Sequence, residues 1–150
     1  MENAGNKKEK AGYITSKDTI ENVYPGLILA VNSVRLGMET KIFYTFMGIN
    51  VLRKGVLKKS KFYPPGLLGA IPGMPWLASK VMKSKIEKAN VPDLPDLQEV
   101  AQVEGVQFIA CDMTMKMMEL TEADLIDGCQ VMTAEDFLKY GKDCEVLLFT

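Results

Sequence analysis

The chain has 150 residues, the size of one domain, and 47% of them are hydrophobic, as in ordinary soluble proteins. Its net charge of −1 gives no reason to expect nucleic acid as a partner. The sequence contains no histidine, which excludes histidine bases, Ser–His and Cys–His nucleophile pairs and histidine metal ligands. Any chemistry must use thiol, carboxylate, lysine, tyrosine or backbone groups, and we expect no cofactor and no bound metal.

The cysteine content and the first ten residues indicate where the protein is located and where its domain begins. Three cysteines, an odd number, and the lack of a recognisable secretory signal argue against a disulfide framework and predict a cytoplasmic protein. Residues 1–10 are polar and lysine-rich, which is typical of a disordered tail. Residues 11–150 are then expected to form one α/β domain.

The first half of the chain predicts two strands, each followed by helical structure. A strand is expected near 12–16, a helix from Asp18 or Thr19 to Arg35, and a β-branched and aromatic strand over 40–46. Pro25 is tolerated only in the first turns of a helix, so a start later than Thr19 is left open. A short helical turn over 48–53 follows.

An apolar stretch at 62–78 interrupts this alternation. It is nearly long enough for a membrane span, but seven prolines and glycines exclude one continuous helix, so we predict no transmembrane segment. We interpret 62–78 as a flexible flap or a contact surface. Residues 76–88 then predict an amphipathic helix with Leu77, Val81 and Ile86 facing inward.

The second half continues the alternation. A helix starting near Pro95 ends at Gly105, and further strands are expected at 106–110, 129–132 and 144–149. Helices are expected at 114–120, after Thr121 and after Thr133. Apolar strands alternating with helices predict a three-layer α/β/α sandwich around a mostly parallel sheet of about five strands.

Charge is unevenly distributed between the two halves. From Arg53 to Lys88 there are nine basic residues and one acidic residue, whereas from Asp93 to Glu145 there are thirteen acidic residues and three lysines. This pattern predicts a basic side and an acidic side of the folded protein. They are either two solvated faces or, on the basic side, a rim that attracts a small anion or an acidic partner.

Cys111 is the strongest candidate for chemistry. Sites in such sheets lie outside the carboxyl ends of strands, and Cys111 ends a strand, whereas Cys129 and Cys144 lie near the start of theirs. Unpaired N–H groups of a helix that follows Cys111 would stabilise a thiolate, the form that attacks sulfur or peroxide, while Asp112 would oppose it. The alternative is a small buried core residue.

The sequence around Cys111 resembles a known family. Residues 110–118 (ACDMTMKMM) are similar to the cysteine motif Ala-Cys-x-Met-Ser/Thr-Met-x-x-Met of the DsrE/DsrF-like family, in the branch often labelled predicted peroxiredoxin. Residues 43–52 and 125–128 resemble two further segments of that family, in the same order. The chain departs from the family at Glu119 and Leu120, where Gly-Ile is usual, at Cys129, where an aliphatic residue is usual, and in its weak first strand.

The resemblance implies a sulfur-relay protein. Such proteins hold sulfane sulfur or thiosulfate on one cysteine, here Cys111, as a persulfide or thiosulfonate and pass it to an acceptor thiol. The implied fold is an α/β/α sandwich, usually in a homo- or hetero-oligomer. The implied partners are TusA-type or rhodanese-type sulfur carriers and a small sulfur anion. Whether the protein is a sulfurtransferase or a stoichiometric carrier stays open.

Three alternatives remain beside this hypothesis. A thiol peroxidase or redox sensor would need Cys129 or an external thiol to resolve oxidised Cys111, and a cation near it such as Arg35 or Arg53. A non-catalytic partner subunit of a sulfur-relay complex is also compatible with the resemblance. Cu(I) binding would need the sulfur atoms of Cys111 and the methionines at 113, 115, 117 and 118 to come together, which the spacing on a helix disfavours.

Overall fold

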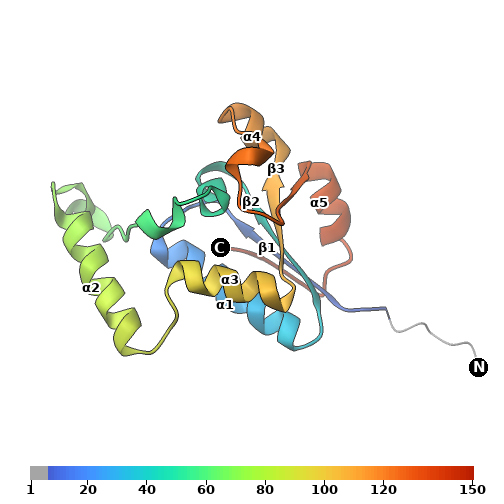
Figure 1. The fold of residues 1–150 in the computed structure, drawn as a ribbon, viewed down its shortest axis with the longest axis horizontal. Coiled ribbons are helices and arrows are strands. Elements are labelled where there is room, and N and C mark those ends of the chain that lie inside the picture. Colours follow the sequence, from blue (N-terminus) through green and yellow to red (C-terminus); the bar gives the residue numbers. More distant parts are fainter. Residues whose placement is uncertain (1–6) are drawn as a thin grey trace, which may run out of the picture.

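The structure is a computed structural model that describes residues 7–150, and its centre is a five-stranded parallel sheet (Figure 1). The strands lie in the order β4-β3-β2-β1-β5. They are β1 (Lys10–Thr15), β2 (Glu39–Tyr44), β3 (Gln107–Cys111), β4 (Gln130–Met132) and β5 (Val146–Phe149). The predicted α/β class and the parallel sheet of five strands are confirmed.

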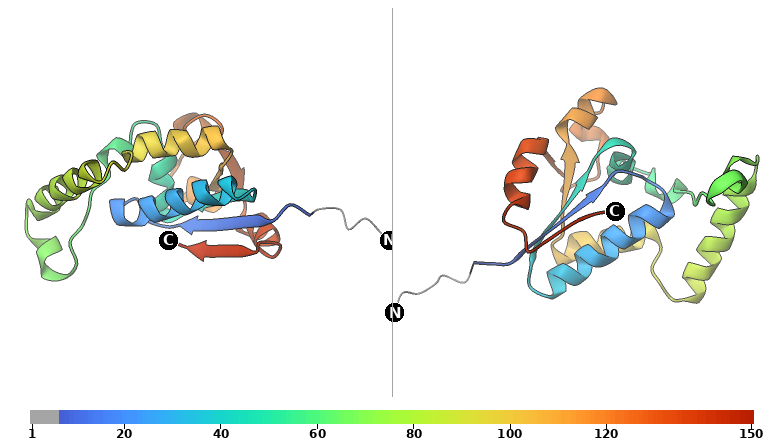
Figure 2. Two further views of the ribbon diagram at one scale, coloured as in Figure 1. Left: turned by 90° about the horizontal axis from the view of Figure 1, so that it is seen from below. Right: turned by 180° about the vertical axis from the view of Figure 1, so that it is seen from behind.

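The helices cover both faces of this sheet (Figure 2). The α-helices are α1 (Ile20–Arg35), α2 (Met74–Lys88), α3 (Leu94–Glu104), α4 (Asp112–Met117) and α5 (Ala134–Gly141). The short 3-10 helices are η1 (Phe46–Leu52), η2 (Leu57–Lys59), η3 (Gly66–Ala70) and η4 (Glu122–Asp124). Helices α1 and α3 pack together on one face and α5 lies on the other, which confirms the three-layer sandwich. In the described part of the chain, no helix has the length and apolar character needed to cross a membrane.

The alternation of side chains along β3 separates two apolar clusters. Phe108 and Ala110 point into the main cluster beneath α1 and α3, while Ile109 and Cys111 point into a smaller cluster beneath α5. Both faces of the strand are therefore buried from Phe108 to Cys111, which explains why these four residues are apolar without a polar alternate position.

Helix α1 keeps Pro25 inside its second turn rather than starting after it. The helix begins at Ile20, and Ile20, Val23 and Leu27 are all buried in the main cluster. Pro25 removes one intrahelical hydrogen bond, but the apolar area buried by that first turn compensates for the loss. The earlier of the two predicted starts is therefore correct.

Residues 57–88, which we call the arm, begin at Leu57 in the main core and then extend away from the sheet (Figure 1). Within it, residues 62–78 form an extended stretch, η3 and the first turn of α2, so no single helix spans them. The inward orientation predicted for α2 is wrong for two residues, because Leu77 is 48% and Val81 50% exposed. The inner face is formed by Ile86, as predicted, together with Met82 and Ser79. The Ser79 hydroxyl accepts a hydrogen bond from the Phe62 backbone N–H at 2.8 Å.

Lys10 belongs to the predicted tail, but it is the first residue of β1, where its N–H donates to the carboxylate of Glu145 at 2.6 Å. The rest of that expectation falls mainly on residues 1–6, which lie outside the described residues.

Candidate functional site

Cys111 is the last residue of β3 and lies at the carboxyl edge of the sheet. Its side chain is 5% exposed and belongs to the cluster formed with Phe43, Ile109 and Phe137. Met132 lies directly opposite Cys111 in the register of β3 and β4 and is only partly buried. The thiol is thus close to the surface but covered by apolar side chains, so a donor would have to approach through this cover.

Helix α4 begins immediately after the cysteine. Cys111 occupies its N-cap position with extended backbone angles, φ −70° and ψ 118°, and its side chain makes no capping hydrogen bond. Asp112 forms an ion pair with Lys116 at 2.8 Å, one turn along the helix, which offsets part of its negative charge beside the thiol. Because α4 has only six residues, its dipole contributes less than that of a long helix.

Thr114 fixes the loop after β2 against α4. Its buried hydroxyl accepts a hydrogen bond from the Phe46 N–H at 3.1 Å and lies 3.2 Å from the hydroxyl of Thr45. Phe46 has a positive φ of 45°, which costs free energy for a residue with a side chain. Thr114 therefore holds a strained backbone turn next to the strand that carries Cys111.

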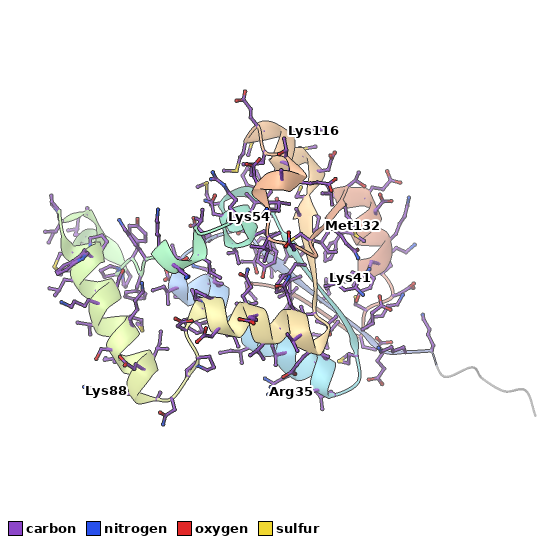
Figure 3. The ribbon with its side chains drawn as sticks, in the orientation of Figure 1. Arg35, Lys41, Lys54, Lys88, Lys116 and Met132 are labelled. Carbon is purple, nitrogen blue, oxygen red and sulfur yellow. The ribbon has the colours of Figure 1, made fainter. Side chains whose placement is uncertain are left out.

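The two arginines considered as partners of Cys111 are engaged elsewhere. Arg35 ends α1 at the opposite edge of the sheet, where its guanidinium binds the carboxylate of Glu104 (Figure 3). Arg53 donates to the side-chain oxygen of Asn50 at 3.1 Å, and Asn50 in turn donates to Asp18. Among the residues that the structure describes, no arginine binds Cys111. The cation that the peroxidase alternative needs near the thiol is therefore not supplied by Arg35 or Arg53.

Neither of the other two cysteines lies near Cys111. Cys129 is on the other face of the sheet, and Cys144 is at the opposite end of the strands. Cys129 packs against the main cluster, on the face opposite to Cys111, so a disulfide between them would need β4 to rearrange. Cys144 lies just before β5, where its thiol donates to the Tyr140 carbonyl at 3.5 Å. All three thiols are free, and only Cys111 ends a strand.

Cys129 gives the stability of the protein a pH dependence in the alkaline range. Burial first, and Asp127 second, raise the pKa of Cys129 from 9.0 to about 11. The folded protein therefore keeps a proton that the unfolded chain releases, so this stabilisation is complete below pH 9 and is lost as the pH rises to about 11. Cys129→Ala should remove at most about 2 kcal/mol of this pH dependence, after discounting for partial exposure.

Urea unfolding of wild type and Cys129→Ala below pH 9 and near pH 11 measures this difference. Val131→Ala changes a neighbour on the same face without removing a titratable group, and should keep the wild-type slope of stability against pH. Equal slopes for wild type and Cys129→Ala would show that Cys129 ionises in the folded protein as easily as in the unfolded chain.

The methionines near Cys111 do not gather around it. Met115 is buried in the main cluster and Met118 packs against it, on the face away from Cys111. Met113 and Met117 point outward and are 75% and 57% exposed. This arrangement provides no set of sulfur ligands for Cu(I), and residues 7–150 contain no cluster of three cysteine and acidic side chains suited to a metal.

A sizeable cavity lies away from Cys111, at the base of the arm. It has a volume of about 650 Å³ and is lined by α1, the carboxyl end of α2 and the loop before α3, including Tyr24, Lys58, Lys83 and Asp93. None of its lining residues is a cysteine. The arm projects to one side of the sheet whereas α4 lies above its carboxyl edge, so the arm does not cover the Cys111 of its own chain (Figure 1).

Sequence reasoning proposed Cys111 as the candidate residue but did not identify the residues that surround it. Phe43 and Phe137 stack with ring centroids 4.6 Å apart and form the floor under the thiol, and Met132 and Thr114 come from two other segments. Only Thr114 carried a signal, as the Ser/Thr position of the cysteine motif. The others become neighbours through strand order, which no local pattern specifies.

Comparisons with known proteins agree with this fold. Residues 7–149 match the model of the DsrE/DsrF/DrsH-like family. The chain is 29% identical to the sulfur carrier protein DsrE2 of Allochromatium vinosum over 157 aligned positions, covering 95% of this chain and 99% of the relative. It is 33% identical to the uncharacterised protein YrkE of Bacillus subtilis, covering 81% of this chain and 84% of the relative.

Two solved structures share the fold at low sequence identity. The ychN protein of E. coli superposes with a TM-score of 0.63 at 12% identity, over 95% of this chain and 99% of that one. The protein MTH1491 of Methanobacterium thermoautotrophicum gives a TM-score of 0.55 at 17% identity, over 95% of this chain and all of that one. With the family match over nearly its whole length, this chain belongs to the DsrE/DsrF/DrsH-like family.

Proposed function

We propose that this protein is a sulfur carrier that holds sulfur covalently on Cys111. The family supports a role in sulfur relay, and the curated relative that aligns over almost the full length is named a sulfur carrier protein. The observation that carries the assignment to Cys111 is its position: of the three free cysteines, it alone ends a strand at the carboxyl edge of the sheet.

The chemistry is thiolate attack on a sulfane sulfur. With a protein persulfide as donor, the Cys111 sulfur forms a bond to the outer sulfur, the S–S bond of the donor breaks, and the donor leaves as a thiolate. Cys111 then carries one extra sulfur atom as a persulfide. With tetrathionate, the same attack leaves a thiosulfate group on Cys111 and releases thiosulfate.

Delivery is the same reaction in reverse order. An acceptor thiolate attacks the outer sulfur, and Cys111 leaves as a thiolate, so no electrons are gained or lost overall. The apolar cover from Phe43, Phe137 and Met132 protects the persulfide from water and small oxidants between the two transfers. The partners are small carrier proteins of the TusA or rhodanese type, and the exchange takes place in the cytoplasm.

Intact-protein mass spectrometry tests the proposal. After incubation with polysulfide or tetrathionate, the wild type should gain one sulfur atom or one thiosulfate group, and dithiothreitol should remove it. Cys111→Ser should gain neither. Cys129→Ser and Cys144→Ser should keep the adduct, because those thiols lie away from the carboxyl edge.

Two results would reject the assignment. An adduct that persists in Cys111→Ser would move the carrier role to another thiol. An unmodified wild type, in which urea-unfolded protein does react, would show that the buried thiol is inaccessible and that a partner subunit must carry the sulfur.

A further inference from the structure

The exposed methionines of this protein gather at one place. Nine of its ten methionines lie within residues 7–150, and three of the nine are exposed: Met47 (51%), Met113 (75%) and Met117 (57%). Met113 and Met117 lie one turn apart on α4, so they share a face of that helix. Met47 belongs to η1, where the N–H of Phe46 donates to Thr114 of α4 at 3.1 Å. All three methionines therefore lie next to the carboxyl end of β3.

Phe46 completes an apolar surface with these methionines. It is 60% exposed and directly precedes Met47 in η1. We call Phe46, Met47, Met113 and Met117 the methionine patch. Exposed apolar side chains grouped in this way mark a contact site on a folded protein. Because methionine is unbranched and polarisable, such a patch adapts its shape to an apolar partner.

The segment that carries α4 is also strongly acidic. Residues 112–136 contain seven acidic residues and one lysine, a net charge of −6. Three of the seven are paired with lysines, and a fourth, Asp124, interacts with Arg53 and Lys54. Glu119 and Glu122, which follow α4, are exposed and form no salt bridge within residues 7–150. A partner that meets the methionine patch therefore meets unneutralised negative charge beside it.

We propose that the methionine patch docks an extended segment of a donor protein, in which apolar side chains flank a persulfide cysteine and basic side chains lie further out. This inference rests on the proposed function, because it describes the donor that loads Cys111. The apolar side chains of the segment pack on the methionines, and its basic side chains face Glu119 and Glu122. Docking holds the donor sulfur at the carboxyl edge, where local opening of the apolar cover admits it to the thiol.

The docking selects among sulfur donors without changing the chemistry of transfer. The outer sulfur of the donor forms a bond to Cys111, the S–S bond of the donor breaks, and the donor leaves as a thiolate. A small sulfur anion such as tetrathionate has no apolar surface to bury and is repelled by the acidic segment. The patch therefore favours a protein persulfide over a small anion as the donor.

Synthetic peptide persulfides test the docking. The first peptide has leucine and phenylalanine beside its cysteine and lysine at both ends, the second replaces the apolar pair with serine and glycine, and the third replaces lysine with glutamate. Intact-protein mass spectrometry follows the gain of one sulfur atom with time. Each rate is divided by the rate at which the same peptide loads free glutathione, which removes differences in intrinsic reactivity. The first peptide should load the wild type at least about tenfold faster than the others, and added salt should slow it.

Two double substitutions separate the apolar and the charged part of the preference. Met113→Gln with Met117→Gln should remove the preference for apolar flanks, and Glu119→Gln with Glu122→Gln should remove the preference for lysine ends. Leu36→Gln is the control, because Leu36 is 80% exposed at the end of α1, and it should keep both preferences. Glutathione persulfide lacks these flanks and should load every variant at the wild-type rate, which separates lost docking from damage to the thiol site.

Two outcomes would overturn the docking. They are equal normalised rates for the three peptides with the wild type, and preferences that survive both double substitutions. In either case, loading by glutathione persulfide would leave the carrier proposal standing. A wild type that no persulfide loads would instead reject the carrier proposal, and the docking with it.

Discussion

Replacing Gly48 with alanine should destabilise the protein by about 3 kcal/mol or more. A Cβ atom at this position would lie 2.2 Å from the Thr15 carbonyl oxygen and 2.8 Å from its carbonyl carbon. Both are backbone atoms at the end of β1, so no side-chain rotation relieves the clash. The η1 segment would have to move off the sheet, which breaks the 3.1 Å hydrogen bond from Thr45 N–H to the Thr15 carbonyl and uncovers Ile49.

Urea unfolding followed by circular dichroism measures this loss. Gly141→Ala is the matched control, because its added Cβ would meet only the flexible end of Leu147 at 3.3 Å, and alanine is the better helix former. The control should stay within about 1 kcal/mol of the wild type. A Gly48→Ala protein as stable as the control would mean that η1 does not pack tightly on β1.

Gly48 matters for the site as well as for the fold. The η1 segment begins at Phe46, whose N–H is held by Thr114 in the first turn of α4. Displacing η1 therefore disturbs the helix that follows Cys111. We expect slower sulfur loading in Gly48→Ala even under conditions where most of the protein is still folded.

Most of the fold could be predicted because local patterns determine it. The alternation of apolar strands with capped helices indicated the class, and Gly105, which has a positive φ in the structure, ends α3 as predicted. The position of Cys111 followed from the same reasoning, because the end of a parallel strand must lie at the carboxyl edge of the sheet.

The surroundings of Cys111 could not be predicted, because they depend on strand order. Strand alternation shows that Cys111 and Ile109 share a face, but not that α5 covers it. Helix α5 connects β4 to β5, and these two strands form opposite edges of the sheet because β5 pairs with β1. The helix therefore crosses the face that carries Cys111 and covers it. The separation of Cys111 from Cys129 has the same origin.

Helical periodicity failed in α2 for a different reason. A pattern of apolar positions indicates which residues share a face, but not whether a partner lies opposite. Within the described chain the arm stands apart from the sheet, so the apolar residues of its first turns have nothing to pack against. The failed orientation of Leu77 and Val81 thus reflects the lack of a partner for this face within the described residues.

Replacing Phe137 with alanine should cost about 3–5 kcal/mol and expose Cys111. Phe137 is 2% exposed and stacks on Phe43 at 4.6 Å, which ties α5 to the sheet. Removing the ring leaves a cavity beside the thiol and loosens the helix that covers it. We expect alkylation of Cys111 in the folded protein to be on the order of tenfold faster, because local opening becomes easier.

Leu138→Ala is the control on the same helix, since Leu138 is 59% exposed, and it should change stability by no more than about 0.5 kcal/mol. Alkylation rates are compared well below the unfolding midpoint of each variant, so that global unfolding does not contribute. A Phe137→Ala protein that loses stability without faster alkylation would show that reagents reach Cys111 from the α4 side. In that case the exposed methionines of α4, rather than α5, would control the entry of a sulfur donor.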